Sequence, residues 1–125
     1  YDLNRLNLLI AIIEKRAGVD LSTHDVYLNI VGGIKVRENA VDLAVAMSII
    51  SAVKNQPIAS STAIFGELGL SGEVRSVPNL EKRVEEAVRL GFKTIVLPRM
   101  KKDASMGTKV KIIETKTLRE AVKNL

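Results

Sequence analysis

Two acidic residues are candidates for chemistry, because each is expected in the first turn of a helix. With Asn39 as the N-cap, Asp42 is the third residue of one helix, and Glu81 follows Asn79 at the start of another. Asp42 then borders an apolar stripe, where a carboxylate needs a stabilising interaction. A capping box and the helix dipole supply one, since both stabilise negative charge in a first turn. These positions favour structural roles for both acids.

The serines and the single histidine are weaker candidates. Ser48 and Ser51 lie three residues apart on one face of the helix that carries Asp42. Serines in a buried helix commonly donate to the carbonyls of their own helix, and no general base is evident beside them. His24 is expected at the edge of a strand, and a single histidine disfavours a histidine triad or a two-histidine metal site. We expect all three to be structural.

The glycines do not form a phosphate-binding loop. Gly32 and Gly33 are not followed by Gly-Lys-Ser/Thr, and Gly66, Gly69 and Gly72 lead into a strand rather than a helix. ATP binding by this chain is therefore not expected. The spacing of the last three glycines indicates a hairpin with a bulge.

Hydrophobic periodicity predicts the elements that position these residues. The expected order is α β α β β α β β α, an α+β fold built as an α/β sandwich, with a mixed sheet packed against helices in a single domain over residues 1–125. The helix that carries Asp42 is apolar almost all round and is expected at the centre. Helices are expected over residues 3–17, 39–54, 79–90 and 118–125, and strands over residues 24–31, 62–65, 73–75, 94–97 and 109–112.

Several residues signal the ends of these helices. Asp2 or Asn4 can cap the first helix, and Gly18 is placed to end it. Thr117 and Glu120 have the spacing of a capping box for the last helix. The sequence thus predicts where the outer helices begin and end.

Composition excludes several classes of protein. The 125 residues are 46% hydrophobic and contain no cysteine, which excludes disulfide scaffolds, cysteine-ligated zinc sites and thiol catalysis. The longest nearly apolar run, residues 40–53, is interrupted by polar residues and is shorter than the roughly 20 residues that span a bilayer. The chain begins at Tyr1 without a signal peptide, so we expect a piece of a longer intracellular protein with no membrane partner.

The net charge of +5 is concentrated near the C-terminus. Residues 99–125 carry eight basic and three acidic side chains, whereas the charges of residues 1–98 cancel. Such a local excess favours a polyanionic partner such as nucleic acid. A solvated lysine face is the alternative.

Four segments together carry a family resemblance: residues 31–36 (VGGIKV), 39–46 (NAVDLAVA), 65–75 (FGELGLSGEVR) and 77–79 (VPN). They resemble the C-terminal Lon-protease-like domain of the RadA (Sms) family of bacterial DNA repair proteins, over essentially the whole chain. The glycine-rich hairpin is shared by several Lon-like domains, whereas the VGGIKV segment is what points to this family.

The resemblance implies a longer parent protein with a zinc finger and a RecA-like ATPase core, both outside this chain. That parent is expected in the cytoplasm as a homohexameric ring that uses ATP, Mg and Zn and drives branch migration of DNA beside the RecA recombinase. The Lon-like domain is expected to be a scaffold that contacts DNA and holds no cofactor of its own.

The resemblance also implies that this domain is not a peptidase. Asp42 stands where proteolytic Lon domains have their nucleophilic serine, and Glu81 stands where they have their general-base lysine. If the fold brings these two carboxylates together, they could share a proton or hold a cation. Helix capping, or pairing with Lys82 or Arg83, is the competing interpretation.

Candidate phosphate contacts without sequence preference lie in two loops: Lys35 and Arg37 in one, and Arg99, Lys101 and Lys102 in the other. Ordinary solvated loop charge is the competing interpretation for each of them. Two other functions stay open: a divergent peptidase that uses Ser48 or Ser51, and a pure oligomerisation module without DNA binding.

Overall fold

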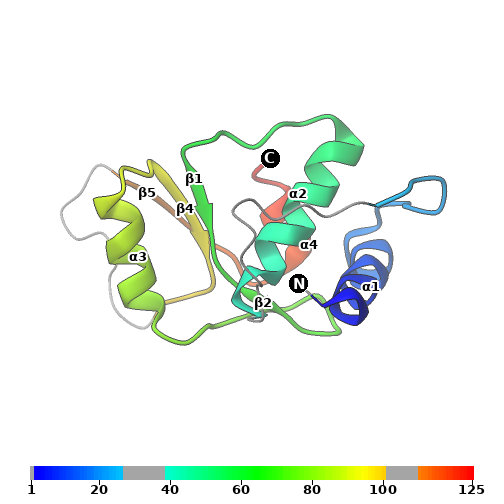
Figure 1. Ribbon diagram of the computed structural model, residues 1–125, viewed down its shortest axis with the longest axis horizontal. Helices are drawn as coiled ribbons and strands as arrows, with labels where there is room; N and C mark the ends of the chain where they lie inside the picture. Colours follow the sequence, from blue (N-terminus) through cyan, green and yellow to red (C-terminus); the bar gives the residue numbers. More distant parts are fainter. Residues whose placement is uncertain (1, 27–38, 101–109) are drawn as a thin grey trace.

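The computed structural model describes residues 2–26, 39–100 and 110–125 (Figure 1). It has the α+β class expected from the sequence, with helices packed against parallel and antiparallel strands. The helices are α1 (Leu3–Ile12), α2 (Asp42–Lys54), α3 (Leu80–Arg89) and α4 (Leu118–Val122). The π-helical turn η1 (Ile13–Ala17) continues α1, and the 3-10 turn η2 (Asn39–Val41) precedes α2. The strands are β1 (Thr62–Ile64), β2 (Glu67–Leu68), β3 (Val74–Arg75), β4 (Thr94–Leu97) and β5 (Lys111–Glu114).

The main sheet has three parallel strands in the order β1-β4-β5. α3 covers one face of this sheet, while α2 and α4 lie on the other face and α1 lies beyond them (Figure 1). Every residue of the central strand after Thr94 is buried, as expected for an apolar run enclosed by helices on both sides. The predicted strand over residues 94–97 is confirmed, and it is fully buried from Ile95 to Leu97, whereas Thr94 is half-buried.

Alternate residues of the sheet divide the core into two clusters. The α3 cluster contains Ile95 and Leu97 of β4, and the α2 cluster contains Val96. The neighbouring strands follow the same division, since Ala63 and Ile112 pack in the α3 cluster and their successors pack in the α2 cluster. The α2 cluster is the larger and includes Leu9, Ile13, Leu43, Met47, Ile50, Leu68 and Leu118.

The glycine-rich hairpin differs from the expected one. We expected residues 62–65 and 73–75 to be its two strands, but β1 pairs with β4 of the main sheet. The partner of β3 is β2, a strand that the sequence did not reveal. Two residues between glycines are too few to show an alternation of apolar and polar side chains, which explains the error.

The expected strand over residues 24–31 is the other difference. Residues 24–26 form no strand, and the chain turns immediately before them. The backbone N–H of His24 donates to the carbonyl of Leu21 at 3.0 Å, and the N–H of Ser22 donates to the carboxylate of Asp20 at 2.9 Å. Residues 27–31 lie outside the described residues.

The predicted caps of the outer helices are confirmed. Asp2 is the N-cap of α1 and accepts from the N–H of Asn4 at 2.8 Å, and Gly18 ends η1 with a φ of +68°. Thr117 is the N-cap of α4 and accepts from the N–H of Glu120 at 3.1 Å. Short polar side chains therefore cap the N-terminal ends of both outer helices, α1 and α4.

Candidate functional site

Asp42 lies at a buried junction of three elements. Its side chain is fully buried and forms an ion pair with Arg5 of α1, with 3.2 Å between Arg5 Nε and Asp42 Oδ1. The backbone N–H of Leu68 in β2 donates to Asp42 Oδ2 at 3.1 Å. Nη2 of Arg5 donates to the carbonyl of Leu68 at 2.9 Å. The carboxylate therefore has a cation and a backbone donor as partners.

The capping-box interpretation of Asp42 is wrong. Asn39 belongs to the 3-10 turn η2, and Val41 is the N-cap of α2, so Asp42 is the first residue of this helix rather than the third. Instead, the backbone of the connection between β1 and β2 forms hydrogen bonds with the backbone at the start of α2. The N–H of Leu43 donates to the carbonyl of Gly66 at 3.0 Å, and the N–H of Gly66 donates to the carbonyl of Ala40 at 2.9 Å.

Glu81 lies in very different surroundings from Asp42. It is exposed in the first turn of α3, as expected, and lines a depression of about 430 Å³ together with Lys82 and Arg99. Arg83, the other predicted partner, donates through Nε to the carbonyl of Pro78 at 2.8 Å. Within residues 2–26, 39–100 and 110–125, no group of three or more acidic or histidine side chains could hold a metal ion.

Of the predicted phosphate contacts, only Arg99 is in the described part of the chain. It is exposed two residues after the end of β4 and lines two depressions, one beside α3 and one beside the end of β5. Lys35, Arg37, Lys101 and Lys102 lie outside the described residues.

Two further cations line the depressions that Arg99 borders. They are Lys82, in the first turn of α3, and Lys116, after β5. Neither was singled out as a DNA contact from the sequence. Lys116 belongs to the C-terminal basic excess, which was the only signal for it. The acidic residues Glu81, Glu114 and Glu120 line the same depressions, so the surface around Arg99 carries both signs of charge.

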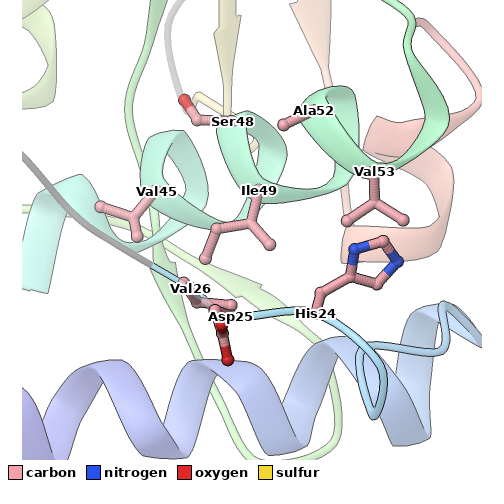
Figure 2. A pocket seen from close by; sticks show the side chains of 8 residues that line it. All are labelled: His24, Asp25, Val26, Val45, Ser48, Ile49, Ala52 and Val53. Carbon is pink, nitrogen blue, oxygen red and sulfur yellow. The ribbon is translucent and has the colours of Figure 1, made fainter.

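The two serines have structural partners. The hydroxyl of Ser48 donates to the carbonyl of Ala44 at 2.7 Å, and the hydroxyl of Ser51 donates to the carbonyl of Gln56 at 2.6 Å. Ser48 shares a depression on α2 with His24 and Asp25, but their side chains point in different directions (Figure 2). These three residues therefore do not form a hydrogen-bonded triad in this arrangement.

The chain belongs to the family described as subunit ChlI of Mg-chelatase, which matches residues 7–101. Among individual proteins, the chain is similar to three that carry the name DNA repair protein RadA. The protein from Listeria monocytogenes is 42% identical over 98% of this chain, the one from Helicobacter pylori is 43% identical over 98%, and the one from Rickettsia bellii is 46% identical over 77%.

These matches cover 27%, 27% and 21% of the respective relatives, so the chain spans about a quarter of their length. In the described part of the chain, every helix is too short or too polar to cross a membrane.

Proposed function

We propose that this chain is a non-proteolytic, Lon-like domain of a RadA-type DNA repair protein, where it serves as a scaffold and helps to hold DNA. The longer protein is a cytoplasmic, hexameric ATPase that drives branch migration beside the RecA recombinase. ATP, Mg²⁺ and Zn²⁺ belong to its other domains. The similarity to proteins named RadA over 98% of the chain supports this assignment.

The observation that carries the non-proteolytic part is the burial of Asp42. A carboxylate that is fully buried and paired with Arg5 is shielded from a substrate and cannot act as the nucleophile of a serine peptidase. The bonded hydroxyl of Ser48 argues against a substitute nucleophile at that position.

The DNA-holding part is supported by charge. Arg99 is exposed between Lys82 and Lys116, and residues 99–125 carry the whole basic excess of the chain. Cations of this kind contact phosphates without reading the bases, and binding then weakens with salt.

The test is fluorescence anisotropy of labelled double-stranded and single-stranded DNA across a salt series. We expect the logarithm of the affinity to fall linearly with the logarithm of salt, and each phosphate contact removed to lower the slope by about 0.7 to 0.9. Arg99→Ala and Lys101→Ala/Lys102→Ala are the test variants. Arg89→Ala is the matched control, because Arg89 is paired with Glu86 on the exposed surface of α3.

The pure oligomerisation module is the second candidate, and the mixed charges around Arg99 favour it. Light scattering for the oligomeric state, combined with the anisotropy measurement for DNA binding, separates the two candidates. Hexamers that bind no DNA even at low salt would leave scaffolding as the function and move DNA binding to other domains. Equal salt slopes for the Arg99→Ala and Arg89→Ala variants would remove Arg99 from the interface.

A further inference from the structure

The β2–β3 hairpin is too small to hold its position alone. Each strand has two residues, whereas an isolated two-stranded hairpin of any length is only marginally stable in water. The N–H of Val74 donates to the carbonyl of Lys116 at 2.8 Å, and the N–H of Leu118 donates to the carbonyl of Gly72 at 2.8 Å. The chain that enters α4 therefore holds one side of the hairpin.

The other side of the hairpin is held by two arginines of the N-terminal helical segment. Arg5 Nη2 donates to the carbonyl of Leu68 at 2.9 Å, and Arg16 Nε donates to the carbonyl of Leu70 at 3.3 Å. Arg16 is exposed, whereas the Arg5 side chain is 19% exposed and also forms the ion pair with Asp42. Arg5 is thus the stronger of the two attachments, because it is better shielded from water and meets a charged partner.

We propose that Arg5 is a coupling residue, which makes α1, the first turn of α2 and the β2–β3 hairpin open and close as one unit. One guanidinium group contacts both Asp42 and Leu68, and the N–H of Leu68 closes the triangle by donating to Asp42. When the Arg5 side chain breaks these contacts, the hairpin loses its attachment to α1 at Leu68, and Asp42 loses the positive charge of Arg5. The α3 cluster on the far face of the sheet has no part in these contacts.

Amide hydrogen exchange measured by NMR on the 125-residue chain tests this coupling. The reporters are the N–H groups of Leu6 in α1, Leu43 in the first turn of α2 and Gly69 in the hairpin, whose acceptors are backbone carbonyls that a change at Arg5 does not remove. The reference amides are Phe92 and Lys111, which donate to Ala87 and Lys93 at 3.1 and 2.9 Å on the α3 side. Opening of a local unit changes the reporters without changing the references.

In the Arg5→Met variant, we expect exchange of the reporter amides to accelerate by about ten- to a hundredfold relative to the reference amides, as for loss of a hydrogen bond to a charged group. Arg89→Met is the matched control, because this arginine pairs only with Glu86 on the surface of α3 among the described contacts. Equal acceleration of reporters and references in the Arg5→Met variant would overturn the proposal.

The single variant leaves Asp42 buried without its countercharge and could unfold for that reason alone. The Arg5→Met/Asp42→Leu variant removes both charges, and replacing a whole buried pair by apolar side chains is often neutral or stabilising. We expect this variant to regain most of its stability in urea while the reporter amides still exchange faster than the references. Normal protection of the hairpin in the double variant would show that Arg5 only neutralises Asp42.

Discussion

Gly72 packs directly against Arg16: a Cβ atom at position 72 would lie 2.8 Å from the Cβ of Arg16. Gly72 also has a φ of +81°, which side chains with a Cβ rarely adopt. We therefore expect Gly72→Ala to lower the free energy of unfolding by about 2 to 4 kcal/mol, from backbone strain and overpacking together. Urea denaturation measures this loss.

Gly91 provides the control for this prediction. Its φ is +90°, but no heavy atom lies within 4 Å of the position that a Cβ would take. Gly91→Ala is expected to cost only the strain, about 1 to 2 kcal/mol. Equal losses for the two variants would show that the contact with Arg16 relaxes freely.

A second prediction concerns the cap of α4. The hydroxyl of Thr117 accepts from the N–H of Glu120, and α4 has only five residues over which to compensate for the loss of this bond. Thr117→Ala is expected to destabilise the protein by about 1 kcal/mol in urea denaturation, whereas Thr117→Ser should retain most of the stability. A loss of the same size for Thr117→Ser would assign the effect to the methyl group instead of the cap.

Glu73 predicts a pH dependence of stability. The pKa of the Glu73 carboxyl lies below its ordinary value of 4.5. The hydrogen bond from its own backbone N–H lowers the pKa most, and hydrogen bonds from Arg75 and Ser71 lower it further. A lowered pKa in the folded state contributes stability that is present above pH 4.5 and is lost as the pH falls through the folded value.

Glu73→Gln removes this titration. The difference in unfolding free energy between the original protein and the Glu73→Gln variant should therefore be largest at pH 7 and shrink towards pH 3. Urea denaturation at several pH values measures that difference. If it stays constant with pH, the carboxylate has no special stabilisation in the folded state.

The peptidase alternative makes a separate prediction. Because the hydroxyls of Ser48 and Ser51 donate to backbone carbonyls, we expect no cleavage of an unfolded protein such as fluorescently labelled casein. Ser48→Ala and Ser51→Ala variants serve as the check on any activity that is seen. Cleavage that disappears in one of them would establish a divergent peptidase.

The predicted phosphate contacts Lys35 and Arg37 make a further prediction. If both contact phosphates, the Lys35→Ala/Arg37→Ala variant should reduce the slope of log affinity against log salt by about 1.4 to 1.8. Anisotropy with double-stranded DNA measures the slope. A shift in affinity at constant slope would point to an indirect effect of the substitutions.

Local signals in the sequence predicted part of this fold. The apolar run of β4 and the caps Asp2 and Thr117 depend on neighbouring residues, and the structure confirms them. The buried pair of Arg5 and Asp42 joins residues 37 positions apart, and no local pattern marks such a contact. The same limit hid the parallel pairing of β1 with β4, which only the tertiary fold decides.

The site was less accessible to sequence reasoning than the fold. First-turn positions suggested capping for both Asp42 and Glu81, but burial separates them, and burial depends on which elements pack together. Lys82 and Lys116 border the same surface as Arg99 although they lie on different elements. Charge counting finds Lys116 only as part of a regional excess, and it misses Lys82, because the charges of residues 1–98 cancel.

The division of the sheet between two clusters has an evolutionary consequence. Ile95 and Leu97 face α3, while Val96 faces α2 and α4, so a substitution in one cluster has few neighbours in common with a substitution in the other. Stability effects of residues without shared neighbours are nearly additive. Substitutions in the α3 cluster and substitutions around Arg5 and Asp42 on the opposite side of the sheet can therefore accumulate independently of one another.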